Sequence, residues 1–246
     1  MKHFNVILFI GYALYTCFGA PGIGQSKTFA RTVRDNPYEM IRDGQSLVKD
    51  GDLILRLSHD PMSRYIKEFN RHDKSYSHAG IVLFENGCPY VYDIVNGEEN
   101  PGECIRRDSL GRFASPRKNS AYGIFRYQLK EDELKRLHEI IQDWISKKVR
   151  FDHAFDFRTD DRMYCSEMIS KAIAEATRGR IAFERTRFTD TEAGLFAAYC
   201  HLSPDYTGKL EIIPIDALYT NRYCHAIKRY DFQKQAVNNF SSLTIN

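Results

Sequence analysis

A cysteine at the predicted start of an amphipathic helix constrains this chain more than any other feature. From Cys165 onward, apolar residues recur at steps of three and four, which predicts a helix with one buried stripe. The stripe consists of Met168, Ile169, Ala172, Ile173 and Ala176. Asp160 and Asp161 lie just upstream, where acidic residues favour a helix start. Free backbone N–H groups and the helix dipole favour a thiolate at such a position. Cys165 is therefore a candidate nucleophile, and the alternative is a small core residue.

A histidine begins the clearest predicted strand. The segment 75–84 is rich in β-forming residues and places His78 at the start of the strand. A second strand is predicted over 90–95. Asn86-Gly87 between them indicates a hairpin, whose loop we expect to exceed two residues. Because side chains alternate between the faces of a strand, a hairpin of suitable register brings Asp93 beside His78.

Cysteine, histidine and carboxylate have the chemistry of a nucleophile, a base and a group that orients the base. Taken singly, each residue has a plainer interpretation. For His78 it is a core or surface histidine whose hydrogen bonds are satisfied. For Asp93 it is an acidic residue at a strand edge or in a turn. The combination with Cys165 favours catalysis.

Three motifs, in this order, resemble the permuted papain-like branch of the NlpC/P60 superfamily, in particular the amidases of the YaeF/YiiX type. They are GDLIL at 51–55, SHAGIV at 77–82 and YCSEMI at 164–169. In the ordinary order the cysteine helix precedes the two strands, whereas here it comes last. The resemblance implies that Cys165 is the nucleophile, His78 the base and Asp93 the third polar residue, a position where relatives often carry glutamate.

The same resemblance implies the fold class and the chemistry. It implies an α+β, papain-like NlpC/P60 fold in circularly permuted order. In that fold an antiparallel sheet packs against helices, and the nucleophile lies at a helix N-terminus. The reaction is acyl transfer, for which we expect no cofactor and no metal.

The first twenty residues are typical of a cleaved signal peptide. A short basic start precedes an apolar run, which is shorter than the roughly 20 residues of a spanning helix. A lipoprotein anchored through Cys17 and an uncleaved membrane anchor are the alternatives. We therefore expect a signal peptide over 1–20, a linker over 21–37, the hydrolase domain over 38–232 and a frayed tail over 233–246. The protein is then exported, to the periplasm or out of the cell.

Further elements are predicted around the three motifs. Helices are expected over 38–48, 61–69 and 131–149. Strands are expected over 52–57, 104–107, 121–127 and 223–230, and a strand edge followed by a helical turn over 212–218. The aromatic residues of 151–157 are expected in the core or in a cleft wall.

Composition excludes some partners. The net charge of +3, from 35 basic and 32 acidic residues, gives no polyanion signal, and nothing matches a nucleic-acid module. No C-x-x-C or H-x-x-x-H pair occurs, which disfavours zinc.

Cysteine usage leaves the question of disulfides open. Without Cys17 the chain has five cysteines, and an odd count in an exported protein implies a free thiol or an intermolecular bond. If Cys165 is the free thiol, the other four allow two disulfides, which a domain of this size does not require. Those four are Cys88, Cys104, Cys200 and Cys224.

Three functions compete. The favoured one is an exported cysteine amidase or peptidase that cleaves amide bonds, with cell-wall peptides as one substrate class. The second is a lipid-directed acyltransferase or phospholipase on the same triad, which the aromatic-rich segment 183–199 favours if it lines an apolar cleft rather than the core. The third is a non-catalytic ligand-binding module. The expected partner is a peptide or lipid-like acyl substrate, with membrane or cell-envelope association and the oligomeric state left open.

Overall fold

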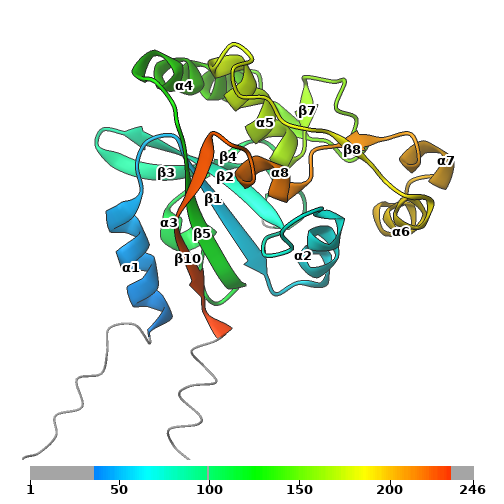
Figure 1. The fold of residues 1–246 in the computed structure, drawn as a ribbon, viewed down its shortest axis with the longest axis horizontal. Helices are drawn as coiled ribbons and strands as arrows, with labels where there is room; N and C mark the ends of the chain where they lie inside the picture. The colour runs from blue at the N-terminus through cyan, green and yellow to red at the C-terminus, as the bar shows by residue number, and fades with distance from the viewer. Residues whose placement is uncertain (1–35, 99, 234–246) are drawn as a thin grey trace, which may run out of the picture. The chain divides into compact units, whose positions relative to one another are not determined.

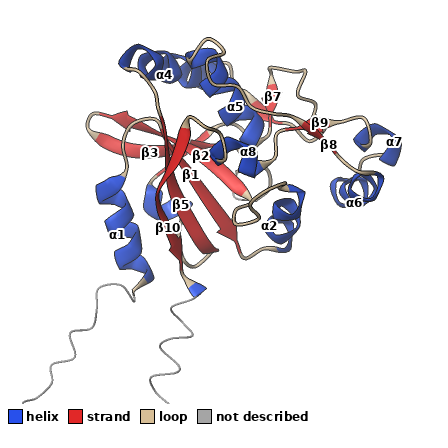
Figure 2. Ribbon diagram, viewed as in Figure 1, coloured by secondary structure: helices blue, strands red, loops and turns tan. Residues whose placement is uncertain are grey.

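A six-stranded antiparallel sheet with the order β10-β5-β1-β2-β3-β4 forms the centre of the chain (Figures 1 and 2). The computed structural model describes residues 36–98 and 100–233. The predicted signal peptide, most of the predicted linker and residues 234–246 of the predicted tail lie outside them. The strands are β1 (Asp52–Ser58), β2 (His78–Glu85), β3 (Cys88–Asp93), β4 (Arg106–Asp108), β5 (Asn119–Tyr127) and β10 (Cys224–Asp231).

Helices cover both faces of this sheet. The helices of the described residues are α1 (Pro37–Leu47), α2 (Pro61–Ile66), the 3-10 helix η2 (Lys67–Phe69), α3 (Leu110–Phe113), α4 (Glu131–Ser146), α5 (Cys165–Ala176), α6 (Asp190–Cys200), α7 (Pro204–Thr207) and α8 (Ile215–Tyr219), of which α6 and α7 lie away from this sheet (Figure 1). Two small sheets complete the fold. One pairs β6 (Arg150–Phe151) with β7 (Arg162–Met163), and the other pairs β8 (Thr186–Arg187) with β9 (Glu211–Ile212).

Alternation along the strands divides the interior into two apolar clusters. Leu53 and Leu55 of β1 pack in the larger cluster, which includes residues of α4 and α5. Ile54 packs in the smaller cluster with residues of α1 and α3. Because both faces of the central strands are buried, residues 53–55 of β1 are all apolar instead of alternating with polar ones. The expected α+β fold, with an antiparallel sheet packed against helices, is confirmed.

The Gly51-Asp52 pair fixes the start of β1. Gly51 has a φ of +78°, which favours glycine. The Asp52 carboxylate is completely buried and accepts two hydrogen bonds from Arg126 of β5, both at 2.7 Å. The backbone N–H of Lys49 donates to it as well, at 2.7 Å. This motif therefore anchors the central strand.

The loop between β2 and β3 is shorter than predicted. Only Asn86 and Gly87 separate the two strands, and both have a positive φ, +50° and +81°. Two such residues form the tight hairpin turn whose twist matches that of the flanking strands. The expectation of a longer loop was wrong, and the second strand correspondingly runs over 88–93 instead of 90–95.

The helix predicted over 131–149 ends at Ser146. Lys148 adopts a φ of +55°, and the N–H of Val149 donates to the carbonyl of Trp144 at 3.1 Å. This turn closes the helix and directs the chain into β6. Beside it, α5 packs against α4, as Figure 1 shows.

The cysteines of the described part of the chain are free thiols. They are Cys88, Cys104, Cys165, Cys200 and Cys224. The open question of two disulfides is thereby answered for this structure. Within the same residues, no helix combines the length and the apolar character that crossing a membrane requires.

Candidate active site

The β2–β3 hairpin brings His78 and Asp93 into direct contact. Nε2 of His78 lies 2.7 Å from Oδ2 of Asp93, a hydrogen-bond distance. Asp93 is completely buried and His78 is 8% exposed. Since Nε2 is engaged by the carboxylate, Nδ1 is the ring nitrogen left for a reaction partner.

Arg106 completes the surroundings of Asp93. From β4, directly opposite Asp93 in the β3–β4 register, its Nε donates to Oδ1 at 2.8 Å and its Nη2 to Oδ2 at 3.0 Å. Burial raises the pKa of the Asp93 carboxyl, but the hydrogen bonds from His78 and Arg106 outweigh it and hold the pKa at about 2. Asp93 is therefore a carboxylate at every physiological pH. Sequence reasoning missed Arg106, although it lies inside the strand predicted over 104–107.

Phe113 and Gly80 position the imidazole. The Phe113 ring lies against the His78 ring, with centroids 5.7 Å apart. Gly80 follows His78 on the same face of β2, and a Cβ there would lie 2.5 Å from Cγ1 of Val91 and 3.1 Å from the Phe113 ring. The glycine of the SHAGIV motif thus makes room for the aromatic ring that packs on the histidine.

Neighbours of Cys165 hold the first turn of α5 in place. Ser166 Oγ donates to the carbonyl of Ile213 at 2.6 Å, and the N–H of Ile213 donates to Tyr164 Oη at 3.0 Å. Glu167 accepts a hydrogen bond from the N–H of Tyr164 at 3.3 Å, which caps the helix. Cys165 begins α5 as predicted, and Tyr164 directly precedes the helix.

Cys165 and His78 line one cavity of about 630 Å³. Burial raises the pKa of the Cys165 thiol to about 11, while hydrogen bonding from the backbone of Ala79 and Ser166 acts in the opposite direction. Burial also lowers the pKa of His78 to about 4, and the charge of Arg56 adds to this shift. Both directions favour a neutral thiol and a neutral imidazole over a thiolate and an imidazolium.

Apolar side chains dominate much of the cavity wall. Phe196, Tyr199 and Cys200 of α6 take part, so the end of the segment 183–199 does line a cleft. Phe151 and Phe155 line the same cavity from the segment before α5. Of the two positions expected for these aromatic residues, core or cleft wall, the structure shows the cleft wall for both. Further apolar lining comes from Met62, Ile66, Phe69, Ile94, Ile212 and Ile215.

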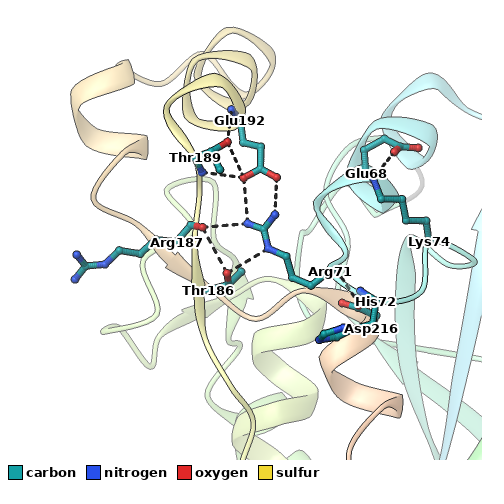
Figure 3. A network of polar contacts seen from close by, with 9 residues as sticks. All are labelled: Glu68, Arg71, His72, Lys74, Thr186, Arg187, Thr189, Glu192 and Asp216. Carbon is teal, nitrogen blue, oxygen red and sulfur yellow. Dashed lines mark hydrogen bonds and ion pairs between the residues drawn. The ribbon is translucent and has the colours of Figure 1, made fainter.

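Arg71 attaches α6 to the rest of the fold, as Figure 3 shows. Its Nη1 donates to Oε1 of Glu192 at 2.6 Å, and its Nε donates to Thr186 Oγ1 at 3.2 Å. The backbone N–H groups of 71–73 donate to the buried carboxylate of Asp216, at 2.5 to 3.1 Å. These contacts hold the aromatic face of α6 against the cavity.

Within residues 36–98 and 100–233, no group of three or more His, Cys, Asp or Glu side chains is arranged to hold a metal ion. The described residues do combine a thiol at a helix N-terminus with a histidine that a carboxylate orients. Such a combination can perform nucleophilic acyl transfer.

Comparison with known proteins agrees with this geometry. A family model described as "Permuted papain-like amidase enzyme, YaeF/YiiX, C92 family" matches residues 47–212. The chain belongs to this family. Membership in the C92 family confirms the resemblance carried by the three sequence motifs.

Two relatives of the C92 type illustrate the match. The uncharacterized protein YiiX of Escherichia coli strain K12 is 26% identical over 133 residues, which are 53% of this chain and 60% of that protein. The crystal structure of a protein titled metalloprotein yiiX, from Escherichia coli O157:H7, superposes with a TM-score of 0.60 and 19% identity. That superposition covers 74% of this chain and 97% of the other, and it establishes a shared fold.

Proposed function

We propose that this chain is an exported cysteine hydrolase that cleaves amide bonds through an acyl-enzyme on Cys165. The contact between His78 and Asp93, at the wall of a cavity that Cys165 also lines, is the observation that carries the proposal. Membership in a family of permuted papain-like amidases supports it. Cell-wall peptides are one substrate class that such an enzyme can act on.

The mechanism starts from the neutral pair. His78 accepts the thiol proton at Nδ1 as the sulfur of Cys165 attacks the carbonyl carbon, and a C–S bond forms. Asp93 stabilises the resulting imidazolium through the hydrogen bond at Nε2. The backbone N–H of Cys165, at the start of α5, donates to the developing oxyanion.

Collapse of the tetrahedral intermediate breaks the C–N bond, and the imidazolium gives its proton to the leaving amine. Water then attacks the thioester carbon while His78 accepts a proton from it. The C–S bond breaks, the acid product leaves, and His78 returns the proton to the sulfur of Cys165. The reaction consumes the substrate and one water molecule, and it leaves Cys165 and His78 in their starting protonation states.

A second candidate function is hydrolysis or transfer of a long acyl chain by the same three residues. The specific support is the apolar lining, in particular Phe155, Phe196 and Tyr199, which suits an alkyl chain better than a polar peptide. A non-catalytic ligand-binding role is the third reading, and an inactive wild-type protein would favour it.

Turnover of matched substrates tests these alternatives. Acyl p-nitroanilides and p-nitrophenyl esters with chains of two to twelve carbons vary the bond type and the chain length independently. We expect hydrolysis of the anilides. A rise in kcat/KM with chain length would add the lipid-directed activity. No turnover of either series would contradict the hydrolase proposal.

Export is part of the proposal and rests on the apolar first twenty residues of the sequence. N-terminal sequencing of the processed protein tests it. A mature chain that begins near Ala20 or at a lipid-modified Cys17 agrees with export, whereas an intact Met1 in exported material contradicts both forms.

A further inference from the structure

Phe155 lines the cavity in a backbone conformation that its own side chain disfavours. Its φ of +54° lies in the left-handed region, where a residue with a bulky ring is rare. The other non-glycine residues with a positive φ in the described part of the chain carry polar or charged side chains. Such a conformation persists only where the surrounding structure imposes it, and it is found at functional sites.

The buried carboxylate of Asp152 imposes this conformation. Its Oδ1 accepts a hydrogen bond from the N–H of Ala154 at 2.8 Å, and its Oδ2 accepts one from the N–H of Asp156 at 2.5 Å. Tyr206 Oη, from α7, donates to the carbonyl of Ala154 at 3.1 Å. The peptide groups on both sides of Phe155 are therefore held, and Asp152 is only 3% exposed to solvent.

The ring of Phe155 lies between the start of α5 and α6. Its centroid is 5.3 Å from that of Tyr164, the residue before Cys165, and 4.8 Å from that of Phe196 in α6. Phe151 meets the same ring edge to face, at 5.9 Å. All four aromatic residues line the cavity, so they form one continuous wall that begins next to the thiol.

A wall of this kind has little freedom to move. The backbone of Phe155 is fixed by hydrogen bonds to its flanking peptide groups, and its ring is packed against three others. A fixed apolar wall discriminates by shape, and a single extra methylene group in such a pocket changes the preference by ~10- to 200-fold. A flexible wall repacks around ligands of different shape and discriminates less.

We propose that Phe155 is the specificity-determining residue of this acyl-transfer site, whose pocket takes acyl groups with an unbranched chain next to the scissile carbonyl. Asp152 acts as a positioning residue, because it reaches the substrate only through Phe155. The inference rests on the proposed function, whose substrate class it narrows to amides and esters of unbranched acyl chains.

Equilibrium binding to the Cys165→Ala variant tests the proposal without turnover. Isothermal titration compares the p-nitroanilide of hexanoic acid with that of 3,3-dimethylbutanoic acid, an isomer that differs only in the branching of the chain. The measured quantity is the ratio of the two dissociation constants. The second substitutions are Phe155→Ala, Phe155→Leu and Asp152→Asn.

Phe157→Ala is the matched control. Phe157 lies two positions further along the same loop, and its ring packs under the cationic groups of Lys171 and Arg185. It does not line the cavity. This substitution therefore removes an equal aromatic ring from the same segment without changing the wall.

We expect Cys165→Ala to bind the hexanoyl compound ~10- to 100-fold more tightly than its branched isomer. Phe155→Ala should reduce this ratio by ~10-fold or more, because the branch can occupy the space that the ring fills. Phe155→Leu should reduce it less. Asp152→Asn should reduce it while the ring is still present, and Phe157→Ala should leave it unchanged. A general loss of structure weakens both ligands and does not produce this pattern.

Equal binding of the two isomers by Cys165→Ala overturns the proposal, and so does a ratio that survives Phe155→Ala. If Phe155→Ala fails to fold, an unchanged ratio in Phe155→Leu overturns it instead. An unchanged ratio in Asp152→Asn rejects the positioning role. Preference for the hexanoyl compound in a protein whose wild type hydrolyses neither anilide would retain the shape-selective site and reject the hydrolase. Hydrolysis by the wild type, with equal binding of the isomers, would do the reverse.

Discussion

Arg106 donates two hydrogen bonds to the Asp93 carboxylate, and the same carboxylate is hydrogen-bonded to Nε2 of His78. The orienting group is therefore itself oriented, and its negative charge is secured in a fully buried position. Such support keeps the imidazole in one tautomer and one orientation, which general base catalysis requires. Asp93 and Arg106 act as one unit in this account.

Asp93→Asn should lower kcat by ~10²–10⁴-fold, because the substitution keeps the shape but removes the charge that stabilises the imidazolium. It also leaves the Arg106 guanidinium facing a neutral group. Asp93→Glu should be the milder change. Steady-state kinetics of both variants check this prediction, and wild-type rates in Asp93→Asn would leave only a Cys165–His78 pair.

The pH dependence of kcat/KM should have its acid limb below pH 6.5. Burial holds the pKa of His78 at about 4, so the imidazole of the free enzyme stays neutral and able to accept a proton down to that range. Because Arg56 helps to lower this pKa, Arg56→Gln should move the limb to higher pH. Arg42→Gln, which removes an exposed guanidinium of α1, should not move it. An acid limb at or above pH 6.5 in the wild type would contradict the assignment.

The same shift affects stability. Between pH 6.5 and about 4 the unfolded chain protonates this histidine, while the folded chain keeps His78 neutral. Its contribution to stability is therefore complete above pH 6.5 and is lost as the pH falls through about 4. Asp93, whose pKa is lowered, loses its contribution only at still lower pH. Urea unfolding of the wild type and of His78→Ala at a series of pH values measures the contribution of His78 to the free energy of unfolding.

Gly80→Ala should destabilise the protein by about 1–3 kcal/mol, because the added methyl group meets Val91 and Phe113 in a packed interior. Displacement of Phe113 should also reduce turnover through His78. Gly194→Ala is the matched control, since open space surrounds that position in α6 and alanine favours a helix. Equal urea midpoints for the two variants would argue against the close packing described here.

Asp52→Asn should cost about 3 kcal/mol, since it breaks a buried ion pair and leaves Arg126 without its carboxylate. The exposed Asp132→Asn, which also removes a partner of an arginine, should leave the urea midpoint nearly unchanged. If both variants unfold alike, the role of the Gly51-Asp52 motif as an anchor of β1 is wrong.

The sequence was sufficient to predict those residues of the site whose positions depend on a local pattern. Strand period and a hairpin signal placed Asp93 beside His78, and an apolar stripe placed Cys165 at a helix start. Arg56 and Arg106 could not be found that way, because each meets the site through a strand pairing whose register depends on the whole sheet. The attachment of α6 by Arg71 and Glu192, 121 positions apart, is equally invisible in a local pattern.

Mass spectrometry of the intact protein after acid quenching tests the central claim most directly. With p-nitrophenyl dodecanoate, or the acyl ester of the chain length that is turned over best, the wild type should gain the mass of one acyl group. Peptide mapping should place that group on Cys165. Cys165→Ala should gain none and lose at least ~10³-fold in turnover, whereas the exposed Cys88→Ala should behave as the wild type. Turnover with the acyl group on another residue, or undiminished turnover by Cys165→Ala, would contradict the account.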